Sequence, residues 1–92
     1  MKNFDDLRNQ LQSEDAYNFA LMEMVGTLMA TRDRKKMTQA QLSALSGVPQ
    51  KTISRIENGI DLPKVSTLLK LSIALGLELK LVDRTEEAIS LA

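Results

Sequence analysis

Apolar residues recur at spacings of three and four along the first three quarters of the chain, which is the period of an α-helix with one buried face. The fold is therefore expected to be all-α over this stretch. The pattern predicts five helices, over about residues 3–11, 13–35, 38–46, 49–58 and 64–75.

The apolar faces of these helices predict the core. The third helix supplies Leu42 and Leu45, and the fourth supplies Ile53 and Ile56, which lie three residues apart. The fifth helix is expected to bury Val65, Leu68, Leu69, Leu71 and Ala74.

Local signals mark where the two short central helices begin and end. Thr38 followed three residues later by Gln41 predicts a capping box at the start of the first. Gly47 can adopt the left-handed conformation that ends a helix, and Pro49 is favoured at the first position of the next. Two short helices joined by a glycine-containing turn predict a helix-turn-helix.

The period changes after Gly76. Leu77, Leu79 and Leu81 alternate with Glu78, Lys80 and Val82, and this spacing of two predicts a strand over residues 77–83. No other segment has a strand pattern, and a lone strand leaves its backbone groups unpaired. Its expected partner is the same strand of a second subunit in a two-fold dimer. The alternative is an irregular extended tail.

Composition removes most enzyme chemistry. The 92 residues contain no cysteine and no histidine, which excludes disulfides, thiolate metal sites and the commonest general base. No nucleophile–base pair or glycine-rich phosphate loop is apparent. No apolar run approaches the ~18 residues of a membrane span, and the N-terminus is too acidic for a signal peptide. A soluble, cytoplasmic, non-enzymatic protein without cofactor or metal is expected.

The net charge of zero hides an uneven distribution. Residues 1–31 hold two basic and five acidic residues, a net charge of −3. Residues 32–64 hold seven basic and three acidic, +4, and residues 65–92 hold three basic and four acidic, −1. A basic middle between acidic ends is typical of one anion-binding face.

The central segment resembles a known family. Residues 38–59 read TQAQLSALSGVPQKTISRIENG, which is similar to the T-Q-x-x-L-x-x-x-x-G-V-x-x-x-T-I-S-R-I-E-N-G signature of the lambda-repressor-like, or XRE/Cro-CI, DNA-binding proteins. The resemblance covers about residues 25–76 and implies a core of about five helices over residues 17–76. Pro49 and Ser46 depart from the pattern, where a hydroxyl residue and an apolar residue are usual.

The resemblance implies roles for individual residues. The base-reading positions correspond to Gln50, Lys51, Thr52 and Arg55, whose side chains are of the types that pair with adenine and guanine edges. The phosphate-gripping positions correspond to Thr38, Gln39 and Asn58, with Lys36 as an electrostatic contributor. Arg32 and Glu57 match a buried ion pair that links the first core helix to the reading helix.

The flanks are similar to those of antitoxins of the HigA and HipB types. The chain divides into an N-terminal extension over residues 1–15, a DNA-binding domain over 16–76, and a strand and tail over 77–92, where Leu77, Leu79 and Leu81 would make the dimer. Phe19 and Met22 widen the apolar face of the long helix beyond what a small core needs.

The function expected from this resemblance is an antitoxin that represses its own operon. Its partners would be a palindromic double-stranded DNA operator, a second copy of the chain, and a toxin. A HigB-like ribonuclease is the first candidate for that toxin and a HipA-like kinase the second. Such ribonucleases are basic, which suits the acidic residues 1–31. The alternative is a stand-alone phage-type transcriptional repressor without a toxin.

Overall fold

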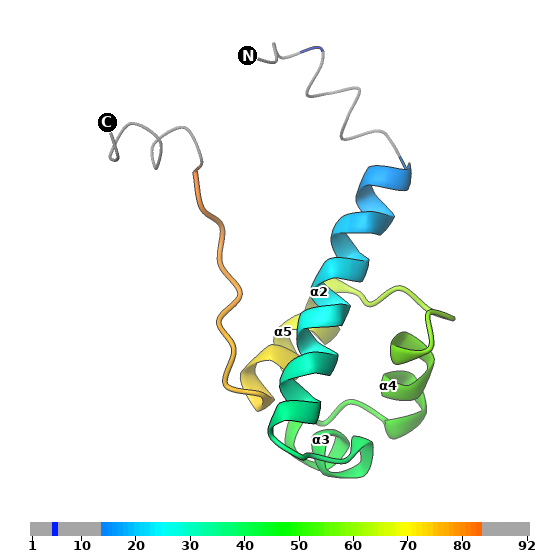
Figure 1. The fold of residues 1–92 in the computed structure, drawn as a ribbon, viewed down its shortest axis with the longest axis vertical. Coiled ribbons are helices and arrows are strands. Elements are labelled where there is room, and N and C mark those ends of the chain that lie inside the picture. Colours follow the sequence, from blue (N-terminus) through cyan, green and yellow to red (C-terminus); the bar gives the residue numbers. More distant parts are fainter. Residues whose placement is uncertain (1–4, 6–13, 84–92) are drawn as a thin grey trace.

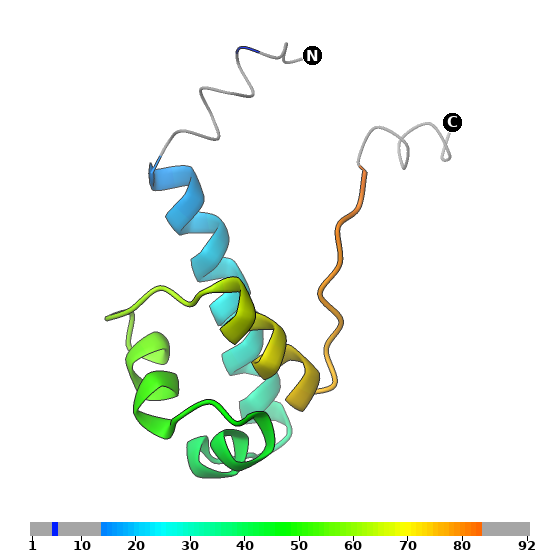
Figure 2. The same ribbon diagram turned by 180° about the vertical axis from the view of Figure 1, so that it is seen from behind.

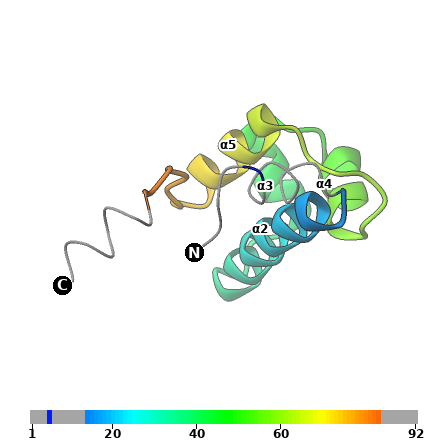
Figure 3. The same cartoon turned by 90° about the horizontal axis from the view of Figure 1, so that it is seen from above.

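The computed structural model describes Asp5 and residues 14–83. Within residues 14–83 it has four helices: α2 (Glu14–Arg34), α3 (Gln39–Ser46), α4 (Gln50–Glu57) and α5 (Val65–Ala74) (Figure 1). Packing joins α3 to both α4 and α5, and α2 to α4. The three short helices lie beside the C-terminal half of α2 (Figure 1), and seen from above they lie on one side of it (Figure 3).

The all-α expectation is confirmed for the described residues, but the number of helices between residues 17 and 76 is four instead of five. Five is the number that the family resemblance implies for this range. The four helices that the hydrophobic pattern predicts between residues 13 and 75 are confirmed, and α2 is one uninterrupted helix of 21 residues with Gly26 inside it. The helix expected over residues 3–11, and with it nearly all of the 1–15 extension, lies outside the described residues.

One apolar cluster holds the four helices together. Its side chains come from α2, α3, α4, α5 and the turns after α3 and α5, and are Leu21, Leu28, Leu42, Val48, Ile53, Leu68, Leu71 and Leu75. Two buried polar side chains, Thr31 and Ser72, were not expected from the sequence. Thr31 Oγ1 donates to the carbonyl of Thr27 one helical turn earlier at 2.8 Å, which satisfies its hydroxyl without a distant partner.

Three of the expected core residues are exposed instead. Leu45 lies at an open groove beside Lys35, Lys36 and Met37. Val65 and Leu69 lie one turn apart on the outer face of α5. The buried face of α5 is taken by Leu68, Leu71 and Ser72, so only one side of this apolar helix meets the core.

The expected signals at the ends of α3 are confirmed. Thr38 Oγ1 accepts from the N–H of Gln41, and the Gln41 side chain accepts from the N–H of Thr38, which makes a capping box. Gly47 ends the helix with φ +76°, in the left-handed region that favours glycine. Pro49 is the N-cap of α4 and not its first helical residue, so the helix begins at Gln50, one residue later than expected.

The end of α2 has a left-handed residue that is not glycine. Lys36 has φ +55°. Its N–H donates to the carbonyl of Asp33 at 2.9 Å, and the N–H of Met37 donates to that of Arg32 at 3.1 Å. These two bonds form a Schellman motif, in which the left-handed position is normally glycine. A lysine at this position therefore makes the backbone conformation less favourable in free energy than a glycine would.

The strand expected over residues 77–83 is not found: the structure assigns no strand within residues 14–83. The segment follows α5 after Gly76. Leu77 packs against the core, and residues 77–79 line a hollow together with α2 and α5. The chain then runs extended, away from the helices (Figures 1 and 2). The N–H of Leu77 donates to the carbonyl of Ser72 at 2.8 Å, which is a turn after α5. A strand needs a ladder of hydrogen bonds to a neighbouring strand, and no such ladder is assigned within residues 14–83. No described helix is long and apolar enough to span a membrane.

Candidate nucleic-acid interface

The second short helix, α4, has sharply different faces. Ile53 and Ile56 are buried in or against the core, with 1% and 4% of their surface exposed, as expected from the sequence. At 100° per residue, the direction opposite these two side chains is occupied by Lys51, Ser54 and Arg55. The outward face of α4 is therefore polar and basic along its length.

The four base-reading candidates differ in their exposure and in their position on α4. Gln50 and Lys51 are exposed, and neither has a polar partner among residues 14–83. Arg55 is half-buried on the outward face, whereas the half-buried Thr52 lies at its edge, closer to the buried side chains. Ser54, which was not among the candidates, lies on the same face, beside Lys51 on the side away from Arg55. Only the helical period identifies it, because its residue type carries no distinctive signal.

Two serines fix the turn that sets α4 against α3. Ser43 Oγ donates to the carbonyl of Val48 at 2.6 Å, and Ser46 Oγ accepts from its N–H at 3.1 Å. Val48 itself is buried in the core. Ser46, where the family usually has an apolar residue, therefore supports the turn through a hydrogen bond.

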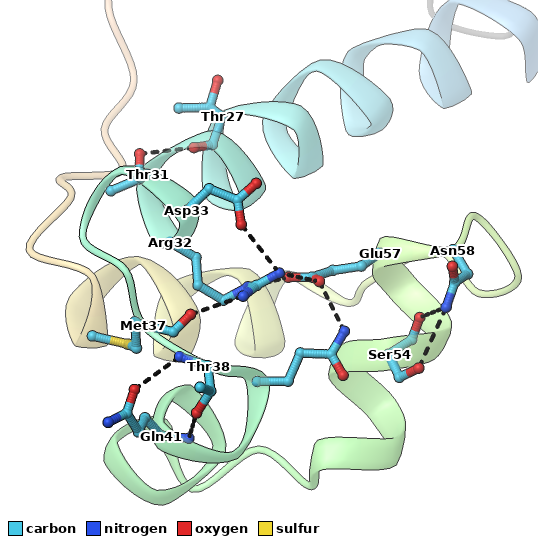
Figure 4. Close-up of polar contacts among 11 residues, drawn as sticks. Thr27, Thr31, Arg32, Asp33, Met37, Thr38, Gln41, Ser54, Glu57 and Asn58 are labelled. Carbon is cyan, nitrogen blue, oxygen red and sulfur yellow. Dashed lines mark hydrogen bonds and ion pairs between the residues drawn. The ribbon is translucent and has the colours of Figure 1, made fainter.

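An ion pair holds the C-terminal end of α4 to α2. Arg32 Nε donates to Oε2 of Glu57 at 2.8 Å, and its Nη2 donates to Oε1 at 2.8 Å. Only 15% of the Arg32 side chain and 10% of the Glu57 side chain are exposed. Figure 4 shows the guanidinium lying between Glu57 and the carbonyl of Met37, which accepts from Nη1 at 2.8 Å. The hydrogen bond to Glu57 is the main cause that raises the pKa of Arg32, against the opposing effect of burial.

The phosphate candidates lie at helix ends, and most of their side chains are engaged. Gln39 Nε2 donates to Oε1 of Glu57 at 2.9 Å, so its amide belongs to the ion-pair network. Asn58 Nδ2 donates to the carbonyl of Ser54 at 2.8 Å and covers the end of α4 (Figure 4). Thr38 is occupied by the capping box, and Lys36 is exposed.

Comparisons with known proteins identify this arrangement. The family model described as Helix-turn-helix matches residues 28–82, which is more than half of the chain. The chain belongs to the helix-turn-helix family. An uncharacterized HTH-type transcriptional regulator of Haemophilus influenzae is 34% identical over 82 residues, covering 87% of this chain and 84% of that protein.

A second relative matches over a shorter stretch. The uncharacterized HTH-type transcriptional regulator y4dL of Sinorhizobium fredii is 42% identical over 57 residues, which cover 62% of this chain and 29% of that protein. No solved structure matches significantly. As a member of the helix-turn-helix family, of the XRE type, the chain is a DNA-binding regulator of transcription and not an enzyme.

A second arginine–carboxylate pair in this helix-turn-helix protein was not expected from the sequence. Arg55 Nε donates to Oδ2 of Asp61 at 2.6 Å, and Nη2 donates to Oδ1 at 3.2 Å. Hydrogen bonding to Arg55 is the main cause that lowers the pKa of Asp61. Asp61 lies in the loop between α4 and α5, outside any recognisable sequence motif, so only the path of the loop brings it to Arg55.

Proposed function

We propose that this protein is a sequence-specific repressor that inserts α4 into the major groove of an operator and reads it with Gln50, Lys51, Thr52 and Arg55. One observation carries the proposal: α4 is held from behind by Ile53, Ile56 and Glu57, while its outward face presents polar side chains to solvent. An anchored helix with free amide and cationic groups suits bidentate pairing with adenine and guanine edges.

The phosphate contacts we propose are Thr38, Gln39, Lys36 and Asn58, at the ends of the two helices. Because the amide of Gln39 is bonded to Glu57, we expect its backbone N–H in the first turn of α3 to face the phosphate. Lys36 supplies an exposed positive charge. Binding should therefore weaken steeply as salt concentration rises.

Selection of duplexes from a random double-stranded DNA pool tests the reading role. Wild-type protein should recover a consensus sequence, and Gln50→Ala should recover one that is relaxed at a single base pair of each half-site. Recovery of unrelated sequences by the wild type would overturn the proposal, and an unchanged consensus with Gln50→Ala would remove Gln50 from the reading set.

We further propose that two copies bind a palindromic operator through an interface at the C-terminal side of the domain. Two groups of exposed apolar side chains support it. Val65, Leu69 and Ile73 are spaced four apart on the outer face of α5, and Leu79, Leu81 and Val82 follow in the extended segment. Exposed apolar side chains grouped in this way often mark a surface that binds another protein. Pairing of the extended segment across a two-fold axis, with Leu77 beside α5, would give residues 78–82 backbone hydrogen bonds.

The solution mass tests the dimer. Leu81 is fully exposed in one copy, so Leu81→Asp should leave the fold of each copy intact and halve the mass measured by light scattering. The half-sites of a two-fold dimer should lie ~34 Å apart or a multiple of this. A Leu81→Asp protein that keeps the wild-type mass would remove Leu81 from the interface, and a monomeric wild type would remove the dimer.

The finer function that we propose is that of an antitoxin, with a basic toxin bound at the N-terminal half of α2. This half of α2 projects beyond the short helices (Figures 1 and 2). It exposes Phe19 and Met22, both with more than half of their surface in solvent, on the same side of the helix as the acidic Asp15 and Glu23. The exposed Tyr17 lies on the opposite side. An apolar patch beside acidic residues suits a basic protein partner.

Copurification with the product of the adjacent gene tests the antitoxin role. Phe19→Asp should abolish copurification while leaving binding to the selected duplex unchanged. If the neighbouring product does not bind the wild-type protein, the chain is a stand-alone repressor, and the DNA-binding proposal is unaffected.

A further inference from the structure

The Arg55–Asp61 pair is fixed by the backbone as well as by side chains. The N–H groups of Ile60 and Asp61 both donate to the carbonyl of Arg55, at 2.9 and 3.3 Å. The chain reverses at Gly59, which has φ +73°. The loop therefore folds back on Arg55 itself, so the carboxylate meets the guanidinium through a short, ordered stretch of chain.

The geometry of the pair uses one edge of the guanidinium and leaves another. A guanidinium is planar and has five N–H donors. Asp61 takes the edge formed by Nε and Nη2, and no other residue in 14–83 forms a hydrogen bond or ion pair with the guanidinium. The edge formed by Nη1 and the second proton of Nη2 is left with two parallel donors, which is the arrangement that matches the O6 and N7 acceptors of guanine.

The charge of Asp61 needs an explanation on a surface that meets DNA. An unpaired carboxylate there would repel phosphate, and both side chains are solvent-accessible, with 43% of Arg55 and 47% of Asp61 exposed. An exposed pair of this kind contributes little to folding. The fixed geometry of the pair is therefore more useful for recognising DNA than for stabilising the fold.

We infer that Asp61 is a positioning residue that sets base specificity: it holds the Arg55 guanidinium so that the Nη1–Nη2 edge meets guanine in the major groove. This inference rests on the proposed function of α4. A free arginine side chain has many rotamers and can reach several acceptors, including phosphates. Fixing one edge reduces the ordering entropy of binding and restricts the contacts that the other edge can make.

The opposite reading is that Asp61 masks Arg55 and must be displaced before DNA binds. The two readings predict opposite changes in affinity for the consensus duplex when Asp61 is replaced by Asn. This substitution keeps the size of the side chain and removes its charge. Loss of a negative charge near DNA strengthens non-specific binding in either case. Only a positioning role makes specific binding weaker at the same time.

The test compares four proteins: wild type, Asp61→Asn, Arg55→Ala and the double variant. Two duplexes are titrated by fluorescence anisotropy, the consensus recovered by the wild type from a random pool and a scrambled duplex of the same composition. Asp61→Asn should bind the consensus about tenfold more weakly while binding the scrambled duplex no more weakly. In the Arg55→Ala background the same substitution should cause no loss. Both single variants should lose discrimination at the same G·C pair.

Several results would overturn the inference. Tighter binding of the consensus by Asp61→Asn would show masking, and an equal loss on both duplexes or in the Arg55→Ala background would show a role unrelated to Arg55. A loss accompanied by a lower melting temperature without a change in base preference would show a structural role. Failure of the wild type to recover any consensus would overturn the proposed function and this inference together, whereas a consensus read equally by Asp61→Asn overturns the inference alone.

Discussion

Two arginine–carboxylate pairs lie on opposite sides of α4 and use nearly the same chemistry. In each, Nε and Nη2 of an arginine donate to the two oxygens of one carboxylate. They differ in their surroundings. Arg32 and Glu57 are mostly buried, and Met37 and Gln39 provide further hydrogen bonds. Arg55 and Asp61 are about half exposed and have only each other within residues 14–83. The buried pair therefore fixes the position of the helix, whereas the exposed pair is available to a ligand.

The largest expected effect comes from breaking the buried pair. Glu57→Gln removes the charge of the carboxylate that pairs with both Nε and Nη2 of Arg32. It leaves the shielded guanidinium with only the exposed Asp33, at 3.5 Å, as a counter-charge, which should lower the free energy of unfolding by about 3 kcal/mol. A urea titration followed by circular dichroism measures it. Glu78→Gln, which removes a charge at an exposed position, is the matched control and should leave the midpoint unchanged. A wild-type midpoint for Glu57→Gln would contradict a structural role for the buried pair.

Lys36→Gly tests the turn at the end of α2, where the carbonyl of Met37 accepts a hydrogen bond from Arg32. Lys36 occupies a left-handed position, so glycine there should raise the free energy of unfolding by about 1 kcal/mol. The same change removes a proposed phosphate contact, and the slope of log K against log salt should fall by about 1. A variant that is both more stable and weaker on DNA would separate the two properties in one residue. An unchanged salt dependence would remove Lys36 from the phosphate contacts.

The smallest expected effect is on the exposed pair. Arg55→Ala should leave the urea midpoint close to that of the wild type, since exposed pairs contribute little. It should raise the pKa of Asp61 toward its ordinary value, because the hydrogen bond from Arg55 lowers that pKa. A folded-state pKa below the unfolded one stabilises the protein at higher pH, and this contribution is lost as pH falls below about 4. The carboxyl carbon shift of Asp61 in a pH titration measures the change, and identical titrations in both proteins would contradict the pairing.

The parts of the fold that follow local rules were predictable. The capping box at Thr38, the end of α3 at Gly47 and the burial of Ile53 and Ile56 depend on nearby residues or on the helical period. The burial of Val65 and Leu69 was predicted wrongly because α5 has apolar residues on more than one face, and only the packing of other helices decides which face is covered. The strand over residues 77–83 was wrong for one copy of the chain because pairing depends on a neighbour.

The candidate site shows the same division. The outward position of Lys51 follows from the buried spacing of the isoleucines in the same helix, and Gln50 is exposed at the first position of that helix. The engagement of Gln39 by Glu57 was missed because the two residues are 18 positions apart. Asp61 was missed because its contact with Arg55 depends on a reversal at Gly59, and an Asp in a loop is most often solvated.

Base-pair discrimination by Arg55 tests most directly whether the exposed side of α4 reads DNA. Each G·C pair of the duplex selected by the wild type is replaced in turn, and binding of wild type and Arg55→Ala is measured by fluorescence anisotropy. If α4 reads bases, the wild type should bind one replaced duplex about tenfold more weakly, and Arg55→Ala should bind that duplex and the original equally. Equal sensitivity of both proteins at every position would contradict base reading by Arg55.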